Sequence, residues 1–145
     1  MAGRLKSKGA ALLLGLGMAA SVGSAHAEGI IALGVPADVA ADGVAIGVAV
    51  RMTLDEAQKE AMSQCKLSEA TDSTISLCAI AGTFTNRRVS VAYNPKDGTT
   101  GFGWAIADDK GAAEKQAMAN CETADGALGL CVIGGSACDG TAIPE

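Results

Sequence analysis

Residues 47–65 have the sequence GVAVRMTLDEAQKEAMSQC, and residues 103–121 have the sequence GWAIADDKGAAEKQAMANC. Aligned without a gap, the two stretches are identical at seven of nineteen positions, which include a glycine, a methionine and a cysteine in the same order. After spacers of different length, Leu77-Cys78-Ala-Ile80 matches Leu130-Cys131-Val-Ile133. Chance aligns alanines easily but not all three of these residue types together. We therefore interpret the chain as an internal duplication, with copy one at about residues 29–87 and copy two at about residues 88–141.

Both copies predict the same order of secondary structure. Strands are expected at residues 29–35, 44–51 and 76–84 in copy one, and at residues 88–93, 101–107 and 128–135 in copy two. A helix is expected after Thr53 and after Asp109, because both side chains are good helix N-caps. The order β-β-α-β, occurring twice, predicts an α+β fold: a mainly antiparallel sheet with two helices packed on one face.

The second strand of each copy alternates large and small residues, so its two faces differ. The large residues are Ile46, Val48 and Val50 in copy one, and Phe102, Trp104 and Ile106 in copy two. We expect the helices to cover this large face, because it has the most apolar surface to bury. The alternative is that the helices lie on the glycine and alanine face. Tyr93, Phe102 and Trp104 would then mark a partner surface.

The N-terminus has the three parts of a secretory signal peptide. Arg4, Lys6 and Lys8 precede an uncharged apolar run at residues 10–22, and small residues precede the bond after Ala27. The run has 13 residues, and a membrane span needs about 20. The sequence thus predicts a signal peptide at residues 1–27, a single mature domain at residues 28–145 with no membrane span, and a periplasmic or extracellular location.

Loss of the signal peptide removes three of the eleven basic residues and none of the sixteen acidic ones, which leaves a net charge of −8. Such an acidic domain repels nucleic acid, so no nucleic-acid partner is expected. The single histidine, His26, also lies in the removed segment. The mature chain therefore has no imidazole for Ser-His-Asp or Cys-His catalysis or for a histidine-bound metal, and we expect no catalytic residues, no metal and no cofactor.

Five cysteines in an exported chain indicate a disulfide framework with one cysteine left over. The duplication favours pairing within each copy, Cys65 with Cys78 and Cys121 with Cys131. Cys138 has no counterpart in copy one and is expected to carry a free thiol. Pairing across the copies, or between Cys131 and Cys138, remains an alternative.

Several short motifs of copy two together resemble one protein family. They are Val91-Ala92-Tyr93-Asn94-Pro95, Gly101-Phe102-Gly103-Trp104-Ala105, the helix at residues 113–121, Cys131-Val132-Ile133 and the late Cys138. This pattern resembles the exported bacterial family known as domain of unknown function 4189. Copy one departs from it, because it lacks the aromatic residues and a third cysteine. The resemblance implies export but no activity, so it assigns no catalytic residue.

Three functions remain as hypotheses. We favour a non-enzymatic module that binds a protein or a cell-envelope component, because the mature chain combines a small disulfide-linked scaffold with no histidine. The first alternative is an inhibitor or immunity-type protein that acts on a secreted enzyme. The second is a small hydrolase that uses carboxylates together with Tyr93 or with Arg87 and Arg88, which requires a cleft where these groups converge.

Overall fold

The computed structural model of the chain describes residues 26–96, 98–126 and 128–139. The predicted signal peptide therefore lies outside the described residues, except for its last two positions. Residues 140 and 141, the last two positions of copy two, also lie outside them. The two halves interpreted from the sequence as copies can be compared over the described residues.

The two halves of the chain have the same order of strands and long helices. Copy one contains β1 (Glu28–Gly34), α1 (Val39–Asp42), β2 (Ala45–Arg51), α2 (Leu54–Lys66), α3 (Asp72–Ile75) and β3 (Ala79–Phe84). Copy two contains β4 (Arg88–Tyr93), β5 (Phe102–Ala107), α4 (Lys110–Asp125) and β6 (Val132–Cys138). The predicted helix caps are present, because Thr53 accepts from the backbone N–H of Glu56 and Asp109 from that of Ala112. The short helices α1 and α3 occur only in copy one.

The strands form two separate three-stranded sheets, one from each copy. Their orders are β2-β1-β3 and β5-β4-β6, and all pairs are antiparallel. The register shifts at the same place in both, after Ile31 and after Val91. The α+β class is confirmed, but the expectation of one sheet with both helices on one face is wrong. Each small sheet is apolar on both faces, so each needs two covering layers.

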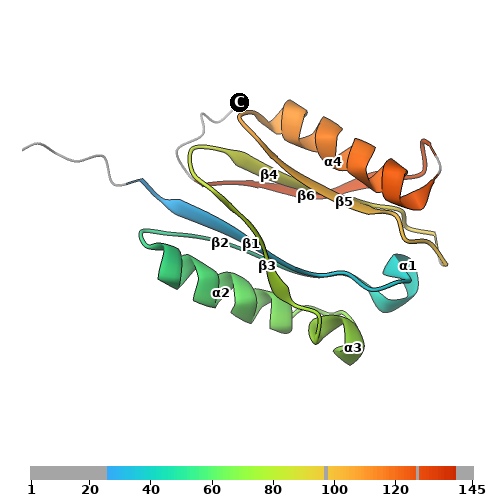
Figure 1. Cartoon of the computed structure of the whole chain (residues 1–145), viewed down its shortest axis with the longest axis horizontal. Helices are drawn as coiled ribbons and strands as arrows, with labels where there is room; N and C mark the ends of the chain where they lie inside the picture. The colour runs from blue at the N-terminus through green and yellow to red at the C-terminus, as the bar shows by residue number, and fades with distance from the viewer. Residues whose placement is uncertain (1–25, 97, 127, 140–145) are drawn as a thin grey trace, which may run out of the picture.

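Those layers make a four-layer sandwich, with α2 and α4 outside and the two sheets between them (Figure 1). The helices lie on the glycine and alanine faces, and the expectation that they cover the large faces is wrong. The reason is close approach: a Cβ atom on Gly47 would overlap the backbone of α2 at Ala61, and one on Gly103 would overlap the backbone of α4 at Ala117. Only glycine lets the helix come this near the strand.

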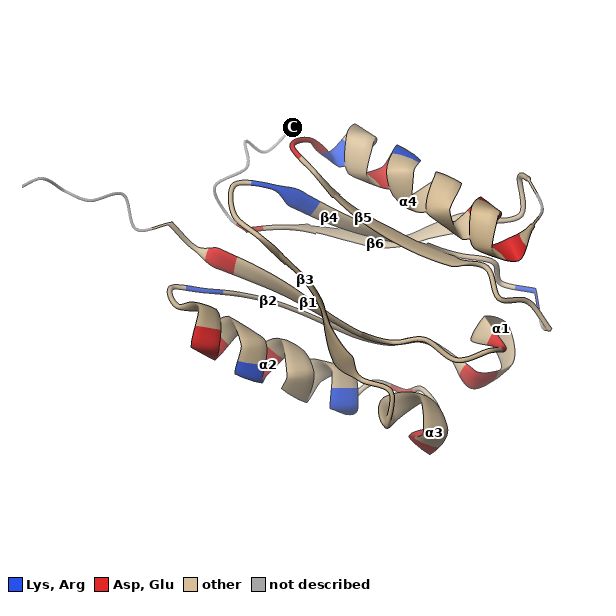
Figure 2. Cartoon of the chain, in the orientation of Figure 1, with Lys and Arg blue, Asp and Glu red and all other residues tan. Residues whose placement is uncertain are grey.

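The large faces of the two sheets pack against each other and form the central core. Sheet β2-β1-β3 contributes Ile31, Leu33 and Phe84, and sheet β5-β4-β6 contributes Val89, Val91 and Phe102. Smaller alanine- and cysteine-rich clusters lie between each sheet and its helix. Charged residues lie mainly on the helices and near the strand ends, and the middle parts of the strands are almost free of them (Figure 2). The fold thus buries its apolar side chains in three clusters, one between the two sheets and one between each sheet and its helix.

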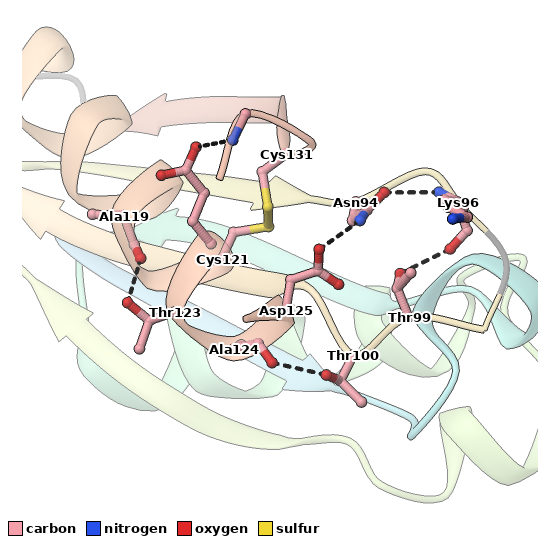
Figure 3. Close-up of a disulfide and its surroundings, with 12 residues drawn as sticks. Asn94, Lys96, Thr99, Thr100, Ala119, Cys121, Thr123, Ala124, Asp125 and Cys131 are labelled. Carbon is pink, nitrogen blue, oxygen red and sulfur yellow. Dashed lines mark hydrogen bonds between the residues drawn. A yellow bond between two sulfur atoms is a disulfide. The ribbon is translucent and has the colours of Figure 1, made fainter. Parts of the chain in front are cut away.

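Two disulfides join the end of each long helix to the chain that follows it. They link Cys65 with Cys78 and Cys121 with Cys131, the pairs that the repeated pattern favours. Figure 3 shows the second of them beside the loop between β4 and β5. Cys138 carries no disulfide and is half-buried. In the part of the chain that the structure describes, no helix has the length and apolar character to cross a membrane.

Candidate functional site

A hollow between the two sheets is the candidate site. Its larger part has a volume of about 320 Å³ and lies beside α1, and its smaller part has about 230 Å³ and follows β6. Both parts are lined by Ile46, Val91 and Gly134, so we describe them together as the inter-sheet cavity. The other lining residues are Val39, Ala40, Gly43, Val44, Tyr93, Pro95 and Phe102 in the larger part, and Val48, Val89, Gly135, Ser136 and Ala137 in the smaller part.

The cavity exists because equivalent positions of the two copies are filled differently. Gly82 pairs with Ile31 in one sheet, and Gly135 pairs with Val91 at the equivalent place in the other. A Cβ atom on Gly82 would lie 3.0 Å from Cη2 of Trp104, so the indole ring fills that space. A Cβ atom on Gly135 would meet no atom within 4 Å.

Comparison of the two copies shows why the space over Gly82 is filled and the space over Gly135 is open. The residue of copy one that aligns with Trp104 is Val48, which is much smaller than an indole. Likewise, Phe84 pairs with Gly29 in β1, whereas Ala137 pairs with the equivalent Val89 in β4. One side of the central core therefore contains two aromatic rings, and the other side contains a valine and an alanine. The smaller part of the cavity is lined by this valine and this alanine, Val48 and Ala137.

The mouth of the larger part is built by segments from both copies. The backbone N–H of Val39 in α1 donates to the carbonyl of Thr99 at 3.0 Å, and that of Gly98 donates to Oδ2 of Asp38 at 2.9 Å. Asp38 also caps α1 by accepting from the N–H of Ala41. These bonds hold α1 against the loop between β4 and β5, so the two halves are joined at the cavity entrance.

A buried asparagine fixes that loop from behind. Asn94 is only 1 % exposed, and its Nδ2 donates to Oδ2 of Asp125 at the end of α4 at 2.8 Å (Figure 3). Its Oδ1 accepts from the N–H of Lys96, and its own N–H donates to the carbonyl of Gly101. The loop that carries Pro95 to the cavity mouth is therefore held by at least three hydrogen bonds from a single residue.

Apart from Tyr93 and Ser136, the side chains that line the cavity are apolar. Tyr93 supplies the only polar side chain among the residues that line the larger part. In the smaller part, the hydroxyl of Ser136 already bonds to Glu114 of α4. Across residues 26–139, the two masked positions apart, no group of histidine, cysteine and carboxylate side chains is arranged to hold a metal ion. Such walls suit an apolar ligand held by contact and by one hydrogen bond.

Charged pairs lie on the outside of the molecule. Lys59 donates to Asp55 at 2.6 Å on the exposed side of α2, and this hydrogen bond raises the pKa of the lysine above its usual value. Arg51, at the end of β2, forms an ion pair with Glu60 of the same helix. The electrostatic interactions of α2 therefore belong to the surface layer and not to the cavity.

The three aromatic residues that were considered as a partner surface lie on neighbouring strands: Tyr93 of β4 pairs directly with Phe102 of β5, and Trp104 lies two residues further along β5. Tyr93 is 37 % exposed at the rim of the cavity, Phe102 is 9 % exposed and lines it, and Trp104 is half-buried over Gly82. Only Tyr93 of the three is exposed, because the large faces of the two sheets pack against each other. Sequence reasoning missed Val48 and Gly135, although the mismatch of valine against tryptophan within the repeat was a visible signal.

The arginine pair lies far from Tyr93. Arg87 forms an ion pair with Asp108 at 3.0 Å, and Arg88 is the first residue of β4, whereas Tyr93 is the last. A strand rises about 3.3 Å per residue, so Arg88 and Tyr93 are separated by about 17 Å. Tyr93 and the arginine pair, the two alternatives named for a hydrolase, therefore lie at opposite ends of β4 and would belong to different sites.

The family model described as Domain of unknown function (DUF4189) matches residues 29–138, which is most of the chain. No curated protein and no solved structure matches it. The matched range begins in β1 and ends with β6, so it includes both sheets, both disulfides and the whole inter-sheet cavity.

Proposed function

Since the chain belongs to the DUF4189 family, whose description gives no activity, we propose from its geometry that it is an exported, non-enzymatic binding domain. Its binding site is the inter-sheet cavity, and its ligand is an apolar component of the cell envelope or of the space outside it. The observation that carries this proposal is the apolar hollow of about 320 Å³ that opens between two sheets beside Tyr93.

The rigid surroundings of the cavity support a binding role. Each sheet is held to its helix through a disulfide and through close backbone packing at Gly47 and Gly103. The mouth is held by Asp38 and Asn94, which bond segments of the chain that lie far apart in sequence. A preformed site loses little conformational entropy when a ligand enters, and this favours affinity.

The chemistry of the walls favours binding over catalysis. Acid–base catalysis needs a titratable group within hydrogen-bond reach of the reacting atom. The residues that line the cavity include no carboxylate, lysine, arginine or cysteine, and Tyr93 is their only titratable side chain. Binding of an apolar molecule needs only the burial of apolar surface, which yields about 25 cal/mol for each Å² removed from water.

The test is titration of the mature, oxidised chain with a dye whose fluorescence rises in apolar surroundings. We expect saturable binding of one dye per chain. Ile46 lines both parts of the cavity, so Ile46→Gln should weaken binding about tenfold or more, since an amide buried against apolar walls lacks partners. Leu67→Gln is the matched control, because Leu67 is 80 % exposed at the end of α2 and should leave binding unchanged.

Equal loss of dye binding in both variants, or no binding by the parent chain, would overturn the proposed site. Circular dichroism melting of each variant shows that the comparison is made on folded protein. The predicted export is tested separately, by the intact mass of the chain recovered from outside the cytoplasm, which should correspond to residues 28–145 with two disulfides.

A further inference from the structure

We propose that the smaller part of the inter-sheet cavity, over Gly135, binds the ring of a flat, uncharged small molecule of the size of indole. This inference rests on the proposed function and names its ligand class. The ligand class is inferred from the other half of the central core, where the indole of Trp104 occupies the equivalent space over Gly82.

The space over Gly82 gives the shape of that group. The indole of Trp104 lies on this glycine with two ring atoms 3.0 Å and 3.1 Å from the position of a Cβ atom, and Ile106 closes the side at 3.2 Å. The glycine has no side chain, so the flat face of the strand and the ring come into contact. Gly135 has the equivalent place in its own sheet, but no ring lies on it and the glycine is exposed to solvent.

The walls over Gly135 are suited to a ring. Val48 lies on the side where Trp104 lies in the other half, and Val89, Val91 and Ala137 complete an apolar surround. The volume of about 230 Å³ is smaller than that of a typical drug-sized site, which begins near 300 Å³. This part of the cavity therefore holds a fragment of one or two rings and not a long chain folded on itself.

The ligand is uncharged at this end because no charged side chain lines either part of the cavity. An ion that enters this hollow would lose part of its hydration without gaining a charged partner, which is unfavourable. A polar substituent is accepted at the other end, where the hydroxyl of Tyr93 at the rim can donate or accept one hydrogen bond. The ligand class is thus an aromatic ring with at most one or two neutral polar groups.

The test uses indole, 1-octanol and a short peptide with one central tryptophan as probes of the mature, oxidised chain. Binding is followed by ligand-observed NMR and calorimetry. We expect indole to bind with one site per chain and at least tenfold more tightly than octanol. Val48→Trp and Ala137→Phe each place in the cavity the ring found at the equivalent position of the other half, so each should weaken indole binding at least tenfold. Leu67→Trp adds the same ring on the surface and should leave indole binding unchanged.

The converse variant is Trp104→Val, which removes the ring over Gly82 and should raise the number of indole sites from one to two. Indole binding that persists in both Val48→Trp and Ala137→Phe would overturn the proposed position. Octanol binding without indole binding would overturn the ring class but leave the proposed function standing, and binding of no probe would overturn both. A peptide that binds tenfold more tightly than indole would overturn the assignment to a small molecule.

Discussion

Substitution of Gly103 by alanine tests the close approach of α4 to β5. The added Cβ atom would overlap two backbone groups of the helix, at Ala117 and Cys121, and backbone atoms cannot rotate away as the end of a side chain can. The whole helix must therefore shift, while the Cys121–Cys131 disulfide holds its end in place.

The size of the effect follows from two opposing contributions. Overpacking of a well-packed site costs about 1–3 kcal/mol, and the rigid backbone contact places Gly103→Ala near the upper value. The reduced freedom of alanine in the unfolded chain returns about 0.4–1 kcal/mol. We expect the free energy of unfolding to fall by about 2 kcal/mol. The melting temperature should then fall by about 8 °C, since 1 kcal/mol corresponds to about 4 °C or more in a domain of this size.

Gly135→Ala is the matched control. It also lies in a strand of the same sheet, but its Cβ atom meets nothing within 4 Å, and neither glycine has a positive φ angle. Only the unfolded-state contribution remains, so the melting temperature should stay the same or rise by a few degrees. The measurement is thermal unfolding of both oxidised variants by circular dichroism. If both melt within about 2 °C of each other, the packing argument is wrong.

Three further predictions concern the disulfides and the cavity mouth. Thiol titration of the denatured, unreduced chain should give one thiol per chain, from Cys138, and a count of three or more would contradict the pairing. Replacement of both Cys65 and Cys78 by serine opens a loop of sequence separation 13 and should lower the free energy of unfolding by about 3 kcal/mol, as measured by urea denaturation. Asn94→Ala removes a buried amide and leaves Asp125 without that donor, so it should cost about 1–3 kcal/mol by the same assay, and a loss below about 0.5 kcal/mol would refute the assigned role.

Much of the local structure could be predicted from the sequence because it depends on neighbouring residues. The alternation of large and small residues predicted the positions of β2 and β5. The N-caps Thr53 and Asp109 predicted where α2 and α4 begin. The short helices α1 and α3 were missed, since four residues are too few to show a helical period.

The arrangement of the layers could not be predicted in the same way. A period of two shows that a strand has two unlike faces, but it does not show which partner covers each face. Gly47 and Gly103 contained the relevant signal, because a strand face made of glycine and alanine is a surface on which a helix can lie closely. Only with both helices placed there do the large faces meet each other.

The candidate site depends on contacts between the copies, which neither copy specifies alone. Tyr93 and Phe102 were singled out for their aromatic rings, and both line the cavity. Gly135 was not singled out as a site residue, because its importance comes from a space that Val48 fails to fill across the sheet interface.

Xenon binding to crystals of the mature, oxidised chain is the most direct test of the unequal filling of the central core. Xenon enters apolar hollows and reports them by its own electron density. We predict a xenon atom over Gly135, beside Val48 and Val91, and none over Gly82, where the indole of Trp104 lies. Absence of xenon over Gly135, with the walls closed together, would contradict the account.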